Sequence, residues 1–438
     1  MTSYFAAHAI LPDGPARDVR FDVVDGRFAS VTAHTSQGSA TALPGVVLPG
    51  FANCHSHAFH RALRGRTHAD GGTFWTWRRR MYDVAGLLDP DTYLALARAV
   101  YAEMALAGIT GVGEFHYLHH APGGASYADP NAMAEALRQG ARDAGIRLTL
   151  LDACYLTGGL AGDGHLPLDD VQRRFADRDA ETWAERVSRL RPDDAFRVGA
   201  AIHSVRAVPR AALPTVVVAS RGGPLHVHVS EQPAENEAAS AYYRRTPTEL
   251  LADAGALGPA TTAVHATHLT PDDVTLLGDA RSTVCLCPTT ERDLADGIGP
   301  APELVDAGAA LSLGSDQHAL IDFFDEARAL ELDERLRSRR RGRFAPAALT
   351  VAMTRHDSIG VPDAGRLEAG ARADLVAVRL DSVRTAGADP AQVTFAAAAP
   401  DVDTVIVDGS VIVAGGVHTL GDVGRMLHNT ISEIWSDA

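Results

Sequence analysis

The chain has 438 residues, 46% of them hydrophobic, so it can bury a large core and form one large domain beside a smaller one. Forty basic residues against 55 acidic ones give a net charge of −15, which disfavours nucleic acid and anionic membrane surfaces as partners. No apolar run is long enough to span a bilayer, the first residues lack a secretory pattern, and four cysteines are too few for a disulfide framework, so we expect a cytoplasmic protein.

The basic residues have one unusual feature, because all 40 are arginine and the sequence contains no lysine. A lysine Schiff base is therefore excluded. A carboxylated lysine that bridges two metal ions is excluded for the same reason.

The first 49 residues alternate apolar and polar positions around a turn at Asp25-Gly26, which predicts a β-hairpin. Short apolar runs rich in β-branched residues then alternate with helical stretches, as in a parallel sheet built from βα units. Eight such runs end near Val46–Leu48, Thr110–Val112, Leu148–Leu150, Val198–Ala201, Leu225–Val229, Thr262–Val264, Val284–Leu286 and Ala310–Leu313. Helix starts lie between the runs, since Asp89-Pro90 and Thr270-Pro271 each place a capping residue before a proline.

The C-terminal segment returns to the alternating pattern, for example over residues 373–378 and 404–409. We therefore predict an α/β fold, a (β/α)8 TIM-like barrel with a small β-sandwich domain built from both termini. The predicted boundaries are residues 50–365 for the barrel, and residues 1–49 and 366–438 for the two parts of the small domain.

Histidines and acidic residues follow the first, fifth, sixth and eighth runs. These motifs are His55-Ser56-His57, His226-Val227-His228-Val229-Ser230-Glu231, His265-Ala266-Thr267-His268 and Gly314-Ser315-Asp316. Residues i and i+2 of a strand face the same side, so His55 and His57 can point at one position. Three histidines and an aspartate at the C-terminal face of a barrel suit a zinc ion that keeps one open position for water.

Each motif alone has an ordinary structural explanation, because His-x-His pairs often pack in cores and aspartates after strands often cap helices. Their occurrence at four strand ends in this order favours a metal site. We expect His226 and His268 to be non-ligands, His226 because it lies deeper in the barrel than His228.

This order of motifs resembles the amidohydrolase superfamily. The segment 49–57 looks like its first-strand signature, and residues 365–370 followed by 373–376 look like its C-terminal signature. The resemblance covers essentially the whole chain and implies a barrel beside a β-sandwich. With no lysine to bridge two metals, the match is to the one-metal deaminase branch.

Four segments, 74–78, 114–120, 203–206 and 265–268, are similar more specifically to the formimidoylglutamate deiminase family. That family converts N-formimidoyl-L-glutamate and water to N-formyl-L-glutamate and ammonia in histidine degradation. The resemblance implies one divalent ion per chain, zinc or alternatively iron, and a homodimer.

The resemblance also implies roles for individual residues. The implied metal ligands are His55, His57, His228 and Asp316. Glu231 and His265 match the proton-transfer pair, and Asp316 is the ligand placed to take a proton from water. The implied substrate-binding residues are Arg78, Tyr117, His203 and Arg206.

The charge of the implied substrate independently asks for arginines. A protein of net charge −15 repels a dicarboxylate at long range, so local arginines must capture it. Arg78 is adjacent to Arg79 and Arg80, and by charge pattern alone it would be a surface residue. Arg206 follows a strand end beside His203 and is better placed.

Three positions depart from the family pattern: His60 replaces glutamine, Gln317 replaces serine and Asp293 replaces asparagine. All three could border the substrate. Because imidazole titrates near neutrality, we expect a substrate-binding His60 to add an acidic-side pH dependence to substrate affinity.

Other functions stay open on the sequence. A deaminase of the same branch could act on a purine, another cyclic amidine or a related N-formimidoyl amino acid. A metal-free binding or interaction protein on this fold is a further alternative, but it would predict gaps in the metal set, and none is present.

Overall fold

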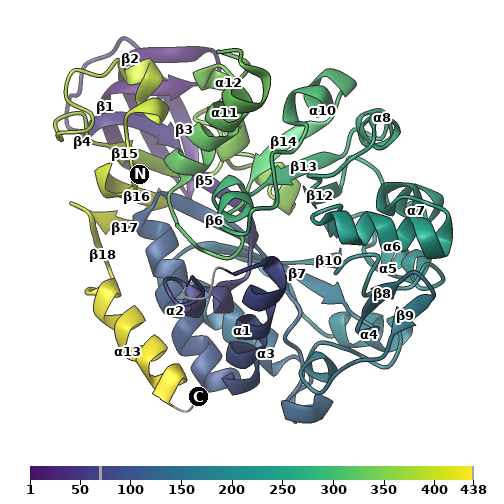
Figure 1. Cartoon of the computed structure of the whole chain (residues 1–438). Helices are drawn as coiled ribbons and strands as arrows, with labels where there is room; N and C mark the ends of the chain where they lie inside the picture. The colour runs from purple at the N-terminus through teal and green to yellow at the C-terminus, as the bar shows by residue number, and fades with distance from the viewer. Residues whose placement is uncertain (69–71, 437–438) are drawn as a thin grey trace.

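The computed structural model describes residues 1–68 and 72–436, and two large sheets organise them (Figure 1). One sheet has the order β14-β13-β12-β11-β10-β7-β6-β5, with every neighbouring pair parallel. Its strands are β5 (Phe51–Ser56), β6 (Ile109–His116), β7 (Arg147–Cys154), β10 (Phe196–Ile202), β11 (Leu225–Val229), β12 (Thr261–His265), β13 (Thr283–Leu286) and β14 (Ala310–Leu313).

The two edges of this sheet meet just beyond β14. Ser56 and Asp316 form a parallel bridge, the Asp316 amide donates to the His55 carbonyl at 3.0 Å, and the His57 amide donates to the Asp316 carbonyl at 3.2 Å. The parallel sheet therefore closes into the predicted eight-stranded barrel.

Helices follow most of the strands and surround the barrel (Figure 1). They are α1 (Phe74–Leu87), α2 (Pro90–Leu106), α3 (Ala132–Ala144), α4 (Ala180–Val187), α5 (Leu213–Ala219), α6 (Pro233–Tyr243), α7 (Pro247–Asp253), α8 (Pro271–Asp279), α9 (Pro288–Asp293), α10 (Ala301–Ala307), α11 (Phe323–Ser338) and α12 (Pro346–Met353). The C-terminal helix α13 (Val423–Ser436) packs against α2. The predicted caps are confirmed, because Asp89 accepts from the Thr92 amide at 2.8 Å and Thr270 accepts from the Asp273 amide at 3.2 Å.

Shorter elements complete the loops. They are the two-stranded sheet of β8 (Gly159–Ala161) and β9 (Gly164–Leu166), and the 3-10 helices η1 (Ala58–Leu63), η2 (Pro122–Gly124), η3 (Gln172–Arg174), η4 (His356–Ile359), η5 (Pro390–Phe395) and η6 (Ala399–Asp401). The β8–β9 hairpin packs against α6.

The second large sheet joins both ends of the chain in the order β18-β17-β16-β15-β4-β1-β2-β3. Its strands are β1 (Thr2–Leu11), β2 (Gly14–Val24), β3 (Arg27–Thr32), β4 (Thr41–Pro49), β15 (Leu375–Val378), β16 (Val402–Val407), β17 (Ser410–Ala414) and β18 (Val417–His418). The predicted turn at Asp25-Gly26 joins β2 to β3, and Phe21, Phe28 and Ile406 share the core of this domain. The fold class is confirmed, while the exact domain boundaries stay a prediction.

One part of the strand prediction was wrong. The run Val46–Leu48 lies in β4 of the small domain, between β1 and β15, and the first barrel strand is β5. Both segments are almost wholly buried, so hydrophobicity does not distinguish them. Only Gly50 separates the two strands, so the chain passes from the sheet of the small domain to the barrel sheet within one residue.

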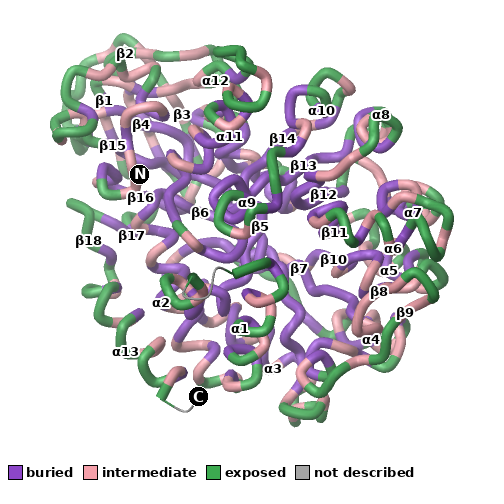
Figure 2. The backbone as a smooth tube through the Cα atoms, viewed as in Figure 1, coloured by how far each residue is buried: buried purple, intermediate pink, exposed green. Residues whose placement is uncertain are grey.

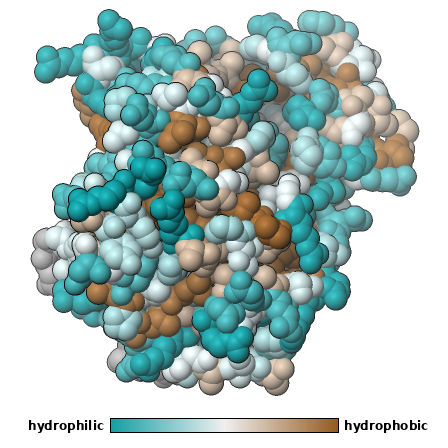
Figure 3. Space-filling model, turned by 90° about the vertical axis from the view of Figure 1, so that its right-hand side faces the viewer, coloured by the Kyte–Doolittle hydropathy of each residue, from teal (hydrophilic) through white to brown (hydrophobic). Residues whose placement is uncertain are grey.

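The barrel strands are mostly buried, whereas exposed residues gather on the helices and loops around them (Figure 2). On the face in Figure 3, hydrophilic residues dominate and hydrophobic ones form smaller patches. Within residues 1–68 and 72–436, every helix is too short or too polar to cross a membrane.

Candidate metal centre and active site

The four predicted metal ligands lie together at the C-terminal ends of barrel strands. His55 and His57 come from the end of β5, His228 from β11, and Asp316 from the segment after β14. Nε2 of His228 lies 3.1 Å from Nε2 of His55, and Oδ1 of Asp316 lies 3.3 Å and 3.4 Å from Nε2 of His55 and His57. All four residues are buried.

The hydrogen bonds of two ring nitrogens test whether this cluster suits a cation. Nδ1 of His57 lies 2.8 Å from the Phe115 carbonyl, and Nδ1 of His228 lies 2.9 Å from the His203 carbonyl. A carbonyl only accepts, so each Nδ1 carries the proton and each Nε2 presents a lone pair to the cluster. Lone pairs and a carboxylate that converge in this way fit a divalent metal ion.

The protonation states of the cluster also fit a divalent metal ion. Burial lowers the pKa of His55 to about 3 and that of His57 to about 4, so both imidazoles are neutral near pH 7. Burial works to raise the pKa of Asp316, but the neighbouring imidazoles outweigh it and hold that pKa below its usual range. Neutral imidazoles and one carboxylate form a donor set that zinc accepts.

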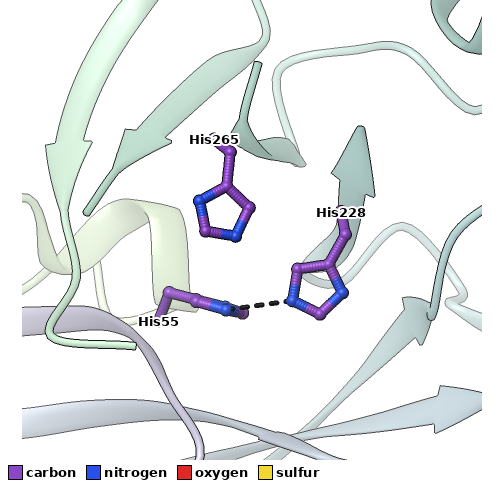
Figure 4. A group of neighbouring side chains, drawn as sticks. All are labelled: His55, His228 and His265. Atoms are coloured by element: carbon purple, nitrogen blue, oxygen red, sulfur yellow. Dashed lines mark hydrogen bonds between the residues drawn. The ribbon is translucent and has the colours of Figure 1, made fainter. Parts of the chain in front are cut away.

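His265 faces the same space as His55 and His228 (Figure 4). Its Nε2 lies 3.6 Å from Glu231, and its Nδ1 lies 3.6 Å from Glu291. Burial lowers the pKa of His265, but Glu231, Glu291 and Asp316 outweigh burial and raise it to about 10. An imidazole with a carboxylate at each nitrogen is placed to carry a proton, which agrees with the predicted catalytic pair.

Glu114 on β6 fixes the turn that carries the two histidines of β5. One carboxyl oxygen accepts from Ser56 Oγ and the other from the Ala58 amide, each at 2.6 Å. These bonds hold the backbone on both sides of His57. Burial raises the pKa of Glu114 to about 7.

A single cavity opens above the cluster and contains all five predicted substrate-binding residues, His60, Arg78, Tyr117, His203 and Arg206. The same cavity is lined by His57, His228, Glu231, His265 and Asp316. The structure thus brings the predicted metal, proton-transfer and substrate residues to one place.

The two arginines reach this cavity from different elements. Arg78 extends from α1 over the rings of Trp75 and Tyr82, at 5.7 Å and 5.2 Å, and has no carboxylate within ion-pair distance among the described residues. Arg206 follows β10, and its Nη2 lies 3.6 Å from Glu231. Arg78 is half-buried, whereas Arg79 and Arg80 are exposed.

His60 lines the cavity as a buried residue in contact with Tyr117. Its Nε2 lies 2.8 Å from the Tyr117 hydroxyl, and the residue is 2% exposed. Burial lowers the pKa of His60 well below its usual value. Desolvation disfavours the imidazolium, which works against the expected acidic-side pH dependence, and that pH dependence stays a prediction.

The other two departures contact each other and do not line the cavity. Gln317 Nε2 donates to Asp293 at 2.8 Å, and the other oxygen of Asp293 lies 2.8 Å from His68 Nε2. That Asp293 and Gln317 border the substrate stays a prediction, although neither lines the cavity. They connect the segment after β14 to α9 and to the loop after η1.

The two histidines expected to be non-ligands also have clear positions. His226 Nε2 lies 2.8 Å from the Ser358 carbonyl, on the side of the barrel away from the cluster. His268 donates its backbone amide to the Ser230 carbonyl at 2.9 Å. Neither belongs to a described group of potential ligands.

Sequence reasoning missed several residues of the site. The cavity wall also contains Trp77, Tyr82, Tyr155 and Phe175. A search for His, Asp and Glu after each strand passes over aromatic residues. Tyr155 alone carried a positional signal, because it directly follows β7.

Similarity to known proteins identifies the family of this chain. Residues 46–412 match the amidohydrolase family, so the chain belongs to this family of metal-dependent hydrolases. Residues 1–41 match the family described as "Formimidoylglutamate deiminase HutF, N-terminal domain". The chain is 36% identical to formimidoylglutamate deiminase from Pseudomonas aeruginosa, covering 95% of this chain and 96% of that protein, and is a homologue of that hydrolytic deaminase.

Two further relatives agree with this placement. A crystal structure of an amidohydrolase from Brucella melitensis has a TM-score of 0.92 and 34% identity, covering 99% of this chain and 100% of that one. An 8-oxoguanine deaminase from Pseudomonas aeruginosa is 30% identical, covering 85% of this chain and 83% of that protein.

Proposed function

We propose that this chain hydrolyses N-formimidoyl-L-glutamate to N-formyl-L-glutamate and ammonia, a step of histidine degradation. The observation that carries the proposal is the presence of Arg78 and Arg206 in one cavity with the histidine–aspartate cluster. Two cationic side chains beside a hydrolytic centre suit a substrate with two carboxylates.

The proposed metal ligands are His55, His57, His228 and Asp316, and they would hold one divalent ion per chain. Zinc suits this donor set, with iron as the alternative. When bound, the ion supplies a water molecule whose pKa is lowered to roughly 7.

The chain's own residues then move protons. Asp316 lies among the ligands and is placed to take the proton of the attacking water. His265 lies 3.9 Å from Asp316 and orients the water. Glu231, 3.6 Å from His265, would carry the proton released by the water to the leaving nitrogen, because an unprotonated amide anion is too basic to leave.

Substrate placement depends on the cavity wall. Arg78 and Arg206 each bind one carboxylate, and His203 and Tyr117 position the formimidoyl group. His60 acts through its hydrogen bond with the Tyr117 hydroxyl, and as a neutral imidazole it can hold that hydroxyl without adding charge.

We further propose a cytoplasmic homodimer. All four cysteines are free and buried, as expected for a reducing compartment. The dimer rests on the family resemblance.

An ammonia-release assay tests the substrate class. Purified protein should release ammonia from N-formimidoyl-L-glutamate faster than from N-formimidoyl-L-aspartate, and should leave guanine and cytosine unchanged. A preference for guanine or cytosine would favour the cyclic-amidine alternative instead.

A further inference from the structure

A second acidic residue lies directly behind Arg206 and has no part in the chemistry above. Glu235 is in the first turn of α6, and its side chain is 1% exposed. It does not line the cavity. A carboxylate with this burial needs a specific charge partner to stay ionised.

That partner is Arg206. Nε of Arg206 lies 3.8 Å from Oε1 of Glu235, while Nη2 of the same guanidinium lies 3.6 Å from Oε2 of Glu231. Neither oxygen of Glu235 makes a hydrogen bond of ordinary geometry to a described residue, and neither does Nε of Arg206. The guanidinium therefore lies between a carboxylate in the cavity and a carboxylate behind it.

Arg206 is one of the groups that favour the ionised form of Glu235. Burial and the nearby Glu231 raise the pKa of Glu235 to about 7, while Arg206 and the backbone of Glu231 and Ser230 oppose the shift. The backbone of Arg206 is also fixed, because its carbonyl accepts from Thr157 Oγ1 at 3.1 Å and lies 3.2 Å from His165 Nδ1. Side chain and backbone of Arg206 are thus both held by residues that do not line the cavity.

Glu231 and the substrate carboxylate would compete for the guanidinium of Arg206. If Glu231 were the sole anion near Arg206, the guanidinium would pair with the residue that must move protons. The arriving substrate carboxylate would then have to displace Glu231. A second carboxylate near the Nε edge of Arg206 gives the guanidinium a competing partner, so that Glu231 is not its sole counter-charge.

We propose that Glu235 is a positioning residue that anchors Arg206 through Nε, so that its Nη atoms meet the substrate carboxylate while Glu231 stays available for proton transfer. The inference rests on the proposed function, since it assigns Arg206 to a substrate carboxylate. It explains why α6 places a buried acid against a cavity arginine.

The first test is Glu235→Gln in the full-length metal-loaded protein. The KM for N-formimidoyl-L-glutamate should rise about tenfold, with a smaller fall in kcat, because the lost anchor affects chiefly carboxylate binding. Glu237→Gln, which removes an exposed charge from the same helix, should leave both constants unchanged. Glu235→Asp keeps the charge, so its KM should lie between the KM of Glu235→Gln and that of the wild type.

The second test is a double-mutant cycle with Arg206→Met. If Glu235 acts through Arg206, Glu235→Gln should add almost nothing once Arg206 is methionine. Additive effects on KM, or an unchanged or lower KM in Glu235→Gln alone, would overturn the inference while wild-type activity preserves the proposed function. Wild-type protein that fails to deaminate N-formimidoyl-L-glutamate would overturn both.

Discussion

Glu231 lies between the two halves of the site, 3.6 Å from His265 and 3.6 Å from Arg206. This position connects the hydrolytic cluster with the residues proposed to hold the substrate. In the proposed reaction, it would give the carboxylate access to the nitrogen that must leave. A proton carrier at this place should matter for turnover much more than for metal binding.

Glu231→Gln keeps the shape of the side chain and removes its ability to exchange a proton. Turnover should fall by roughly a hundredfold or more, since general acid–base catalysis contributes about 10²–10⁴. Metal content should stay at the wild-type level, because Glu231 is not a proposed ligand. Near-normal turnover with full metal content would remove Glu231 from the mechanism.

Arg206 tests the charge of the substrate. A charge-assisted hydrogen bond contributes about 1.5–3 kcal/mol, so Arg206→Met should lower kcat/KM by about ten- to a hundredfold. Arg79→Met is the matched control, because Arg79 is exposed one residue after Arg78 on α1. If both variants keep wild-type kcat/KM, a dicarboxylate is the wrong substrate.

Some residues of this site could be predicted from the sequence, and others could not. His55 and His57 could be predicted, because strand parity alone aligns two side chains. Arg78 could not be separated from Arg79 and Arg80 by charge, since only the packing of α1 decides which of them faces the cavity.

At the scale of elements, β6 supports the end of β5 and the turn after it, which carry two of the proposed metal ligands. Glu114 binds Ser56 and the Ala58 amide with two carboxyl oxygens, one on each side of His57. A glutamine has one carbonyl oxygen, so it cannot accept both bonds. The orientation of His57 should therefore depend on the carboxyl group at position 114.

Glu114→Gln should lower metal content per chain and destabilise the fold by about 1–3 kcal/mol, the cost of an unsatisfied buried group. Metal analysis and thermal unfolding would measure the two effects. Glu135→Gln removes an exposed partner of Arg138 and should change neither. Full metal content in Glu114→Gln would show that the turn holds its shape without this support.

Sequence patterns predict some helices and strands correctly and others wrongly. Helix starts at Asp89 and Thr270 were predicted correctly because a cap and a following proline act locally. The assignment of Val46–Leu48 to the barrel failed, because the end of β4 and all of β5 are buried and only Gly50 lies between the two strands. Only tertiary pairing separates them.

At the scale of the whole molecule, the closed barrel gathers side chains from β5, β11, β12 and the segment after β14. The order of motifs along the chain predicted this gathering, because the C-terminal ends of parallel barrel strands share one face. The aromatic residues Trp77, Tyr82, Tyr155 and Phe175 of the cavity wall were not predicted as site residues, since all except Tyr155 carry no pattern that distinguishes a cavity from a core.

Because the chain contains no lysine, no carboxylated lysine can bridge two metal ions, and we expect one metal ion per chain. Purified protein should carry one tightly bound divalent ion per chain, and a chelator that removes it should abolish turnover. Readdition of one equivalent of zinc or iron should restore activity. Two tightly bound ions per chain would contradict the single-metal site.

The identity of the products tests the central claim most directly. Water added to the formimidoyl carbon leaves two nitrogens that could depart, and Glu231 is proposed to protonate the terminal one. We predict that N-formimidoyl-L-glutamate yields ammonia and N-formyl-L-glutamate in equal amounts, as measured by NMR of the reaction mixture. Glutamate and formamide as products, or no turnover by metal-loaded protein, would contradict the account.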